Sequence, residues 1–294
     1  LVRSPAFRSY LAKGDYRKPL ELNAPVNPER ALSVLVIPFS SWQKLIIARD
    51  VSHIKNLENM RQTFIANISH ELRSPLTVLN GYMETLKQMP NASVEPLKTA
   101  LPHMLHHSDR ITSLIEDLLA LSKLETKPLN DNDQPVAVAD LIGHLQKARD
   151  VILKNRKLNL NFDVDEGLLV KGSNSEIQSV VSNLFNNAVR YTEDGGLITV
   201  SWQRYREGAV YSVQDTGIGI PQEHIARLTE RFYRVDADRS RESGGTGLGL
   251  AIVKHVLERH QAILEVESEP GKGSIFRAIF PVTRVITRKT TTRK

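Results

Sequence analysis

The sequence predicts an α+β protein in which a long helical hairpin is followed by an α/β sandwich, with a short β segment before both. Three observations indicate this fold class. Apolar residues recur every three or four positions between residues 52 and 124, which is the period of an amphipathic helix. Short strand-like runs then alternate with helical patterns over residues 136–283. Two brief runs rich in Val, Ile and Leu precede the hairpin.

Length and composition limit the possible classes of protein. A chain of 294 residues can hold two domains, or two domains and a fragment. It contains no run of about eighteen apolar residues, so we expect this chain not to cross a membrane by itself. It has no cysteine, which excludes disulfides and thiolate metal sites and fits a reducing compartment. Its first residue is Leu1 rather than methionine, which suggests a fragment with a missing upstream part.

Residues 1–51 are the first predicted domain. The runs SVLVIP (33–38) and KLIIA (44–48) predict two strands joined as a hairpin. Two strands rarely fold alone, so we expect this piece to lack partners. Up to the junction RDVS (49–52) it resembles the C-terminal part of a PAS sensory domain, and a generic β extension is the alternative.

Residues 52–126 are predicted to form the helical hairpin. The first helix spans about 52–87, and its apolar stripe comprises Phe64, Ile68, Leu72, Leu76, Leu79, Met83 and Leu86. The second spans about 97–124, has Pro102 in its first turn, and carries Leu101, Leu105, Ile111, Leu114, Ile115, Leu118, Leu119 and Leu121. The segment QMPNASVEP separates the two helices. A hairpin this long exposes both stripes, so we expect two copies to pair as a homodimeric four-helix bundle.

One histidine of the first helix lies off the apolar stripe and next to a carboxylate. His70 precedes Glu71, and Ser74 is one turn further along the same outer face. Pro75 removes the amide that would bond the carbonyl of Glu71, so we expect a bend there. An exposed imidazole is mostly neutral at cytoplasmic pH and therefore nucleophilic, and a neighbouring glutamate can orient it and take its proton. The alternative is a plain surface histidine on a bundle helix.

A second group of histidines lies on the other helix. His103, His106 and His107 include an i, i+4 pair, a spacing that can bind a metal ion. No acidic or thiol ligand is placed to complete such a site. We therefore expect a solvated helix face there and no bound metal.

The remaining residues are predicted to form a linker, a second domain and a tail. Residues 127–135 are polar and form the linker. In residues 136–283 we expect helices at 140–155, 175–191 and 248–259, and strands at 158–164, 168–171, 197–204, 209–215, 263–267 and 274–281. Residues 284–294 form a basic tail that we expect to be disordered, with anionic lipid or nucleic acid as minor possibilities. The net charge of +6 does not by itself indicate a DNA-binding protein, and we expect no direct nucleic-acid binding.

Two polar motifs of this domain have a spacing suited to a nucleotide. In NLFNNAVRY (183–191), Asn183 and Asn187 are four residues apart on a helix and share a face. Amide oxygens there can complete a Mg²⁺ shell, although buried asparagines on helices are common. In DTGIGIP (215–221), Asp215 can accept a hydrogen bond from an exocyclic amine such as that of adenine. Gly217 and Gly219 allow the backbone to turn and approach a base.

Two further motifs are suited to phosphate. GGTGLGL (244–250) opens a helix, and its residues Gly245, Thr246, Gly247, Leu248 and Gly249 form a turn whose amides and helix dipole favour an anion. Its spacing is neither that of a dinucleotide fingerprint nor that of a Walker loop. RFYR (231–234) contributes Phe232 and Arg234, and the polar segment after it is expected to be mobile when the site is empty. It could order when Arg239 or Arg241 meets a triphosphate, and a plain surface loop is the alternative.

The segment FIANISHELRSPLTVL (64–79) closely resembles the H-box of sensor histidine kinases. The four later motifs resemble, in order along the chain, the N, G1, F and G2 boxes of a GHKL-type ATP-binding domain, and stretches such as RLTERFYRVDADRSR are most similar to the sensor kinases of the phosphate regulon. This resemblance implies a protein-histidine kinase. Such an enzyme transfers phosphate from ATP to His70, with Glu71 as base, and passes it to an aspartate on a response-regulator receiver domain.

The resemblance also implies roles for single residues of the ATP site. It assigns Mg²⁺ coordination to Asn187, adenine recognition to Asp215, and the ATP lid to about residues 235–246. Arg190 and Tyr191 match positions that flank the phosphates and the nucleoside. GHKL ATPases such as gyrase have a general-base glutamate where this chain has Asn183. An amide cannot take a proton from water, which favours a kinase over an ATP-driven clamp.

Other properties of the family extend beyond these residues. Members often also dephosphorylate their regulator with a Thr or Asn at the position of Ser74, so phosphatase activity is plausible here. The resemblance implies an intact protein anchored to the inner membrane, with these domains in the cytoplasm, and upstream sensory and transport partners. A scaffold that binds nucleotide without chemistry is the non-enzymatic alternative, but such a protein is expected to have lost His70, Asn187 or a motif glycine.

Overall fold

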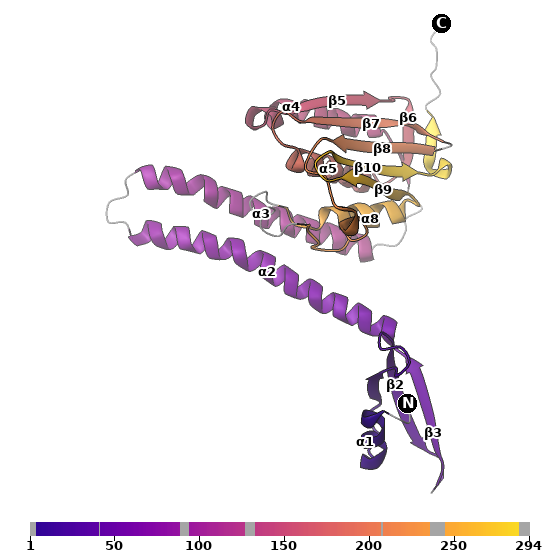
Figure 1. Ribbon diagram of the computed structural model, residues 1–294. Helices are drawn as coiled ribbons and strands as arrows, with labels where there is room; N and C mark the ends of the chain where they lie inside the picture. The colour runs from indigo at the N-terminus through magenta and orange to yellow at the C-terminus, as the bar shows by residue number, and fades with distance from the viewer. Residues whose placement is uncertain are drawn as a thin grey trace. The chain divides into compact units, whose positions relative to one another are not determined.

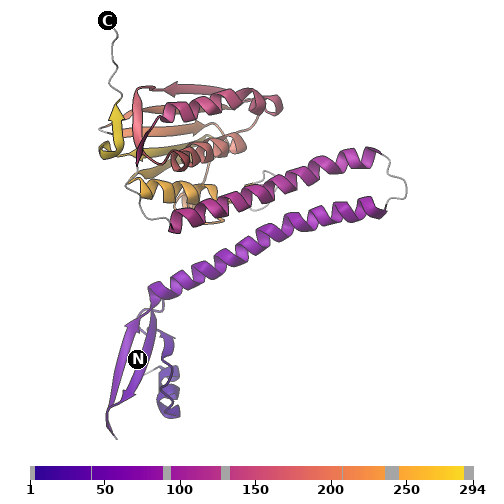
Figure 2. The same cartoon turned by 180° about the vertical axis from the view of Figure 1, so that it is seen from behind.

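The computed structural model describes residues 4–40, 42–88, 94–126, 133–206, 208–235 and 245–287, without the side chains of 94–95 and 148–155. The chain divides into two compact units, residues 1–70 and 71–294. Figures 1 and 2 show the elements from opposite sides.

The first unit begins with a small α/β segment. Helix α1 (Pro5–Lys13) is followed by strands β1 (Leu20–Asn23), β2 (Ala31–Pro38) and β3 (Lys44–Asp50), which form an antiparallel sheet in the order β1-β2-β3. Phe7, Val34 and Val36 form its buried core. The predicted hairpin of two strands is confirmed as β2 and β3. We did not predict α1 and β1, because each is too short to show a clear period.

Two long helices follow. Helix α2 (Ser52–Gln88) and helix α3 (Val94–Thr126) agree with the predicted hairpin, and in both views residues 71–88 of α2 lie antiparallel to α3 (Figures 1 and 2). Helix α2 continues through Pro75, and the expected bend stays a prediction. Helix α3 begins at Val94, so Pro102 is its ninth residue, and the prediction that it stands in the first turn is wrong.

The C-terminal domain has two sheets. Strands β5 (Asn159–Val164), β7 (Leu197–Tyr205), β8 (Gly208–Asp215), β10 (Gly273–Phe280) and β9 (Ile263–Glu269) form the large sheet in that order. Its strands are antiparallel except for the parallel pair β5 and β7. Strands β11 (Val285–Thr287), β6 (Leu168–Gly172) and β4 (Gln134–Val136) form the small sheet. This arrangement agrees with the predicted fold class.

Helices α4 (Val138–Asn155), α5 (Asn174–Tyr191) and α8 (Gly249–Arg259) cover one face of the large sheet (Figure 2). Helix α5 buries the stripe Ile177, Val180, Val181, Leu184, Phe185 and Ala188. Tyr211 of β8 is buried beneath it and donates a hydrogen bond to the carbonyl of Val181 at 3.0 Å. Because α5 buries this stripe, its opposite, polar face is turned outward.

Some short elements and boundaries differ from the sequence predictions. Residues 285–287 were expected in a disordered tail, but they form β11 and pair with β6. Gln134 and Pro135 were expected in the linker, but they belong to β4. The four-residue helix α6 (Gln222–Ile225) was not predicted either. Three or four residues are too few to establish a period, so tertiary pairing decides these segments. Residues 127–132 and 288–294 lie outside the described residues.

Candidate functional site

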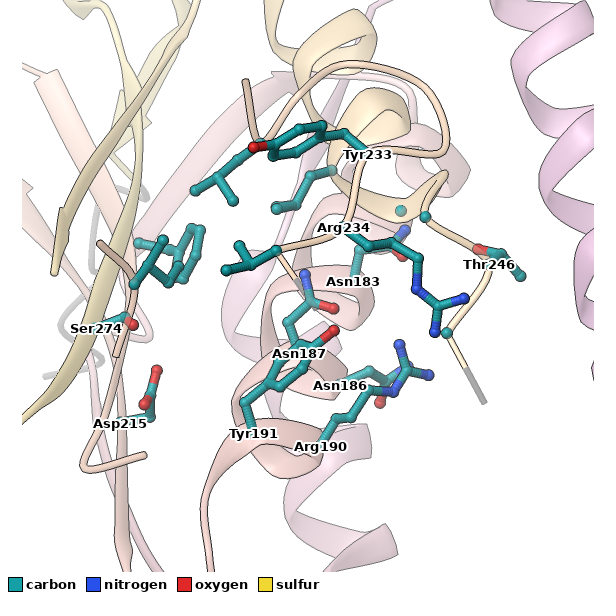
Figure 3. A pocket seen from close by; sticks show the side chains of 18 of the residues that line it. Asn183, Asn186, Asn187, Arg190, Tyr191, Asp215, Tyr233, Arg234, Thr246 and Ser274 are labelled. Carbon is teal, nitrogen blue, oxygen red and sulfur yellow. The ribbon is translucent and has the colours of Figure 1, made fainter. Parts of the chain in front are cut away.

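A cavity of about 1010 Å³ is formed around the outer face of α5, the segment after β8 and the glycine-rich segment before α8. It brings together most residues of the four motifs, namely Asn183, Asn187, Arg190, Tyr191, Asp215, Gly219, Arg234, Gly245, Thr246, Gly247 and Gly249. In Figure 3, Asp215 and Ser274 lie at one end, and Arg190, Arg234 and Thr246 lie at the other. The side chains of Asn187 and Tyr191 lie between them. The cavity is therefore polar and acidic at one end and cationic at the other.

The acidic end contains a buried carboxylate. Asp215 ends β8 and has 5% of its surface exposed. Its Oδ1 accepts a hydrogen bond from the amide of Gly217 at 2.8 Å. Burial raises the pKa of Asp215, and the amides of Gly217 and Ser274 offset this only in part. A carboxyl group with this burial and orientation can accept a hydrogen bond from an amine of a ligand that enters the cavity.

The glycines after Asp215 shape the backbone. Gly217 does not line the cavity, and a Cβ there would lie 2.3 Å from the carbonyl oxygen of Tyr191. Gly219 lines it with a φ of 68°, and a Cβ there would lie 2.0 Å from the carbonyl oxygen of Glu269. A side chain at either position would push the segment away from its neighbours. Their role is therefore to let the chain turn closely around the end that contains Asp215.

The outer face of α5 contributes the amides. Asn183 donates a hydrogen bond from Nδ2 to the carbonyl of Ser179 at 2.9 Å. Its Oδ1 lies 2.5 Å from the position that a Cβ on Gly249 would take. Gly249 is therefore needed for Asn183 to keep this position. Asn187 lies one turn further toward Tyr191, so both predicted asparagines line the cavity from one face.

The cationic end contains two arginines and the glycine-rich segment. A Cβ on Gly245 would lie 2.7 Å from Nη1 of Arg190, so this guanidinium packs directly on the backbone. Burial lowers the pKa of Arg234, and the nearby carboxylate of Glu71 partly opposes this change. Thr246 donates a hydrogen bond from Oγ1 to Oδ2 of Asp117 at 2.6 Å. Two guanidinium groups next to the glycine backbone before α8 form an environment that suits phosphate oxygens.

Besides Gly217, two predicted contact residues do not line the cavity. Leu248 directly precedes α8, and its side chain is fully buried. Phe232 has a φ of 63°, and its amide donates a hydrogen bond to the carbonyl of Gly247 at 2.9 Å. A Cβ on Gly247 would lie 2.9 Å from Cα of Phe232. Phe232 therefore supports the glycine-rich segment through its backbone. Residues 236–244 of the predicted lid, including Arg239 and Arg241, lie outside the described residues.

Several lining residues were not predicted. Asn186 lies between the predicted asparagines, and Tyr233 lies inside the RFYR motif, so both had a local signal. Tyr233 contacts Nδ1 of His224 through its hydroxyl at 2.6 Å. Ser113, Glu116 and Asp117 of α3 also line the cavity, and burial raises the pKa of Asp117. Their contribution depends on packing between distant segments, which leaves no local pattern.

The predicted phosphoacceptor segment lies on α2. His70 and Ser74 are exposed, as expected from their place off the stripe. Oε2 of Glu71 accepts a hydrogen bond from Nη2 of Arg110 at 2.6 Å, and Nη1 of Arg234 lies 4.0 Å from the same oxygen. Within the described residues, no group of three metal-ligating side chains occurs, at the histidines of α3 or elsewhere.

Comparison with known proteins identifies two domains. Residues 60–127 match the His Kinase A (phospho-acceptor) domain. Residues 172–284 match the histidine kinase-, DNA gyrase B- and HSP90-like ATPase family. Across the described ranges, no helix is both long and apolar enough to cross a bilayer.

Curated relatives extend the similarity to nearly the whole chain. The phosphate regulon sensor protein PhoR of Pseudomonas aeruginosa is 44% identical over 97% of this chain and 64% of its own length. The PhoR of Haemophilus influenzae is 38% identical over 96% of this chain and 65% of its own length. The chain thus spans less than two thirds of either relative. The crystal structure of the histidine kinase ThkA in complex with the response regulator protein TrrA is 19% identical, with a TM-score of 0.58 over 100% of this chain and 87% of that one, and it supports the fold.

Proposed function

Because this chain belongs to the sensor histidine kinases of two-component systems, we propose that it transfers the γ-phosphoryl group of ATP to His70 and then to a response regulator. One observation carries the proposal. A single cavity joins a buried carboxylate, Asp215, to a pair of arginines, Arg190 and Arg234, across an asparagine-rich helix face. Adenosine triphosphate has the complementary arrangement, with an amine at one end and negative charge at the other.

The geometry supports one orientation of ATP. The exocyclic amine of adenine donates to Asp215, and the triphosphate extends past Asn187 toward Arg190, Arg234 and Thr246. The glycine-rich segment fits this role, because side chains at Gly245 or Gly249 would displace Arg190 or Asn183. The amide oxygen of Asn187 is a ligand type that Mg²⁺ accepts, and the bound ion would neutralise charge on the phosphates.

The chemistry requires a nucleophile other than water. Asn183 lacks a basic group, so a water molecule beside the γ-phosphate is not deprotonated and hydrolysis is slow. One nitrogen of the His70 ring attacks the γ-phosphorus, and the bond to the β–γ bridging oxygen breaks, which releases ADP. The proton on the other ring nitrogen passes to Glu71. Positioning and charge neutralisation provide most of the rate acceleration.

The partners follow from the same proposal. We place the protein in a homodimer through the hairpin, and an aspartate of a receiver domain takes the phosphoryl group from His70. The two relatives named phosphate regulon sensor protein PhoR support a role in phosphate-regulon signalling. We also propose that the intact protein is anchored at the inner membrane. Ser74, an exposed residue one turn from His70, supports a second activity, removal of phosphate from the regulator.

The test is phosphate labelling of the chain with γ-labelled ATP. In His70→Gln the acid-labile label should be lost while ATP still binds, because the cavity is unchanged. His53→Gln is the matched control, since His53 is another exposed histidine of α2, and it should label at the wild-type rate. Acid-labile label retained in His70→Gln would reject the assignment. Addition of a receiver domain should then transfer the label from wild type to that domain.

A further inference from the structure

An arginine outside every motif holds the carboxylate next to the phosphoacceptor histidine. Nη2 of Arg110, from α3, donates to Oε2 of Glu71, from α2, at 2.6 Å. The side chains are 10% and 22% exposed, respectively. This contact lies within the hairpin of one chain. Charge-assisted hydrogen bonds of this length between partly buried groups are strong and directional.

The contact leaves the two oxygens of Glu71 in different environments. Arg110 contacts Oε2, and Nη1 of Arg234 lies 4.0 Å from that same oxygen. Neither contact uses Oε1. The side chain is therefore anchored at one oxygen, which fixes the direction in which the other oxygen points.

Stability alone is a weak reason for this pair. Removing two charges from water offsets much of their attraction, so apolar residues of similar size would hold the hairpin equally well. The pair is instead informative because of its place, since Glu71 directly follows His70 in the chain. A proton acceptor must be held near its donor, and a displacement of about 1 Å can slow a reaction about 100-fold.

We propose that Arg110 is a positioning residue for phosphoryl transfer to His70. It anchors Oε2 of Glu71, so that Oε1 takes the proton from the His70 ring as the bond between nitrogen and phosphorus forms. This inference rests on the proposed function, because it takes Glu71 as the base. It adds a requirement that the phosphoacceptor motif does not contain, namely an arginine on the opposite helix of the hairpin.

The experiment measures initial rates of His70 labelling across ATP concentrations. Arg110→Ala should lower the rate at saturating ATP about 10- to 100-fold and leave the KM for ATP within about twofold, because the cavity does not include Arg110. Arg110→Lys keeps the charge without the planar fork and should lie between Arg110→Ala and wild type. Arg73→Ala is the matched control. Arg73 is an exposed arginine two residues after Glu71, and its removal should leave the rate unchanged.

A double-mutant cycle separates positioning from a merely structural role. Glu71→Gln should itself lower the rate about 100-fold or more. Adding Arg110→Ala to Glu71→Gln should then change the rate by less than about threefold, since the group that Arg110 positions is already gone. Equal losses in both backgrounds would overturn the inference, and so would a wild-type rate in Arg110→Ala.

Two further outcomes keep the test decisive. If Glu71→Gln labels at the wild-type rate, the base assignment in the proposed function fails, and this inference fails with it. If Glu71→Gln is slow and Arg110→Ala is normal, only the inference fails. Should Arg110→Ala unfold, Arg110→Lys decides instead, because a severalfold lower rate with an unchanged KM supports positioning and a wild-type rate contradicts it.

Discussion

The hairpin and the nucleotide domain bury their apolar residues in opposite ways. Exposed large apolar side chains of the hairpin are Ile54, Leu57, Met60, Ile65, Leu76, Val78, Met83, Leu97, Leu101, Leu105, Ile115 and Leu119. In the described part of the nucleotide domain, only Tyr191, Leu197, Ile263 and Val282 are exposed to this degree. The nucleotide domain completes its core within one chain. The hairpin leaves apolar stripes for another surface to cover.

The free energy gained by burying these side chains decides how each part is stabilised. Burial of one exposed leucine is worth about 1.5–3 kcal/mol, so we expect a hairpin with many of them to gain most of its stability from the proposed association. The nucleotide domain has no such deficit, since Trp202, Leu184 and Ile252 are almost fully buried within it. Stability of the first part should depend on protein concentration, and that of the second should not.

The largest expected effect is loss of the dimer on breaking the hairpin stripe. Leu101 and Leu119 lie on one face of α3 and are 49% and 55% exposed. The double variant Leu101→Glu, Leu119→Glu should be monomeric at micromolar concentration in sedimentation velocity, because charges replace the apolar contact. Ile263→Glu, which changes an equally exposed residue of β9, should stay dimeric. A double variant that remains dimeric would contradict the bundle.

The second prediction tests whether the nucleotide domain completes its core within one chain. Leu184→Ala removes a fully buried side chain of α5 and should lower the free energy of unfolding of the nucleotide domain by about 2–5 kcal/mol. Denaturant unfolding at two protein concentrations measures this loss. The loss of unfolding free energy should be the same at both concentrations. A loss that depends on concentration would contradict a core completed within one chain.

The third effect concerns the acidic end of the cavity. Asp215→Ala should weaken ATP binding about 10- to 100-fold, because a hydrogen bond to a charged group contributes about 1.5–3 kcal/mol. The variant should also lose discrimination against GTP, whose base has a carbonyl in place of the amine. Calorimetric titration with both nucleotides measures this. An unchanged preference for ATP over GTP would show that a group other than Asp215 recognises adenine.

The smallest effect lies where the two parts meet. Burial raises the pKa of Asp117, so its ionised form is disfavoured in the folded protein at neutral pH. Asp117→Asn should therefore raise the melting temperature by a few degrees at pH 7.5. The gain should shrink as the pH falls through the raised pKa of Asp117 toward its ordinary value of 3.8, because the wild-type carboxyl is then protonated as well. If the increase in melting temperature became larger on acidification, the raised pKa of Asp117 would be contradicted.

Sequence reasoning located the long helices and the motif residues, because period and glycine spacing are local properties. It failed where tertiary packing decides. The side chain of Leu248, a predicted contact residue, is fully buried outside the cavity lining, so a contact through its backbone stays a prediction. Asp117 and Arg110 contact motif residues from another helix, and the sequence around them does not predict these contacts. Residues 285–287 carry apolar Val and Ile, but a polar, basic composition around them masks a strand.

The close packing of Asn183 on Gly249 also limits how this protein can evolve. Any side chain at position 249 would collide with the amide oxygen of Asn183, 2.5 Å from the new Cβ. A variant with alanine there must turn the amide of Asn183 away from its present position, which also breaks the hydrogen bond to Ser179. The two positions, far apart in the sequence, are therefore coupled, and a change at one alters which side-chain positions fit at the other.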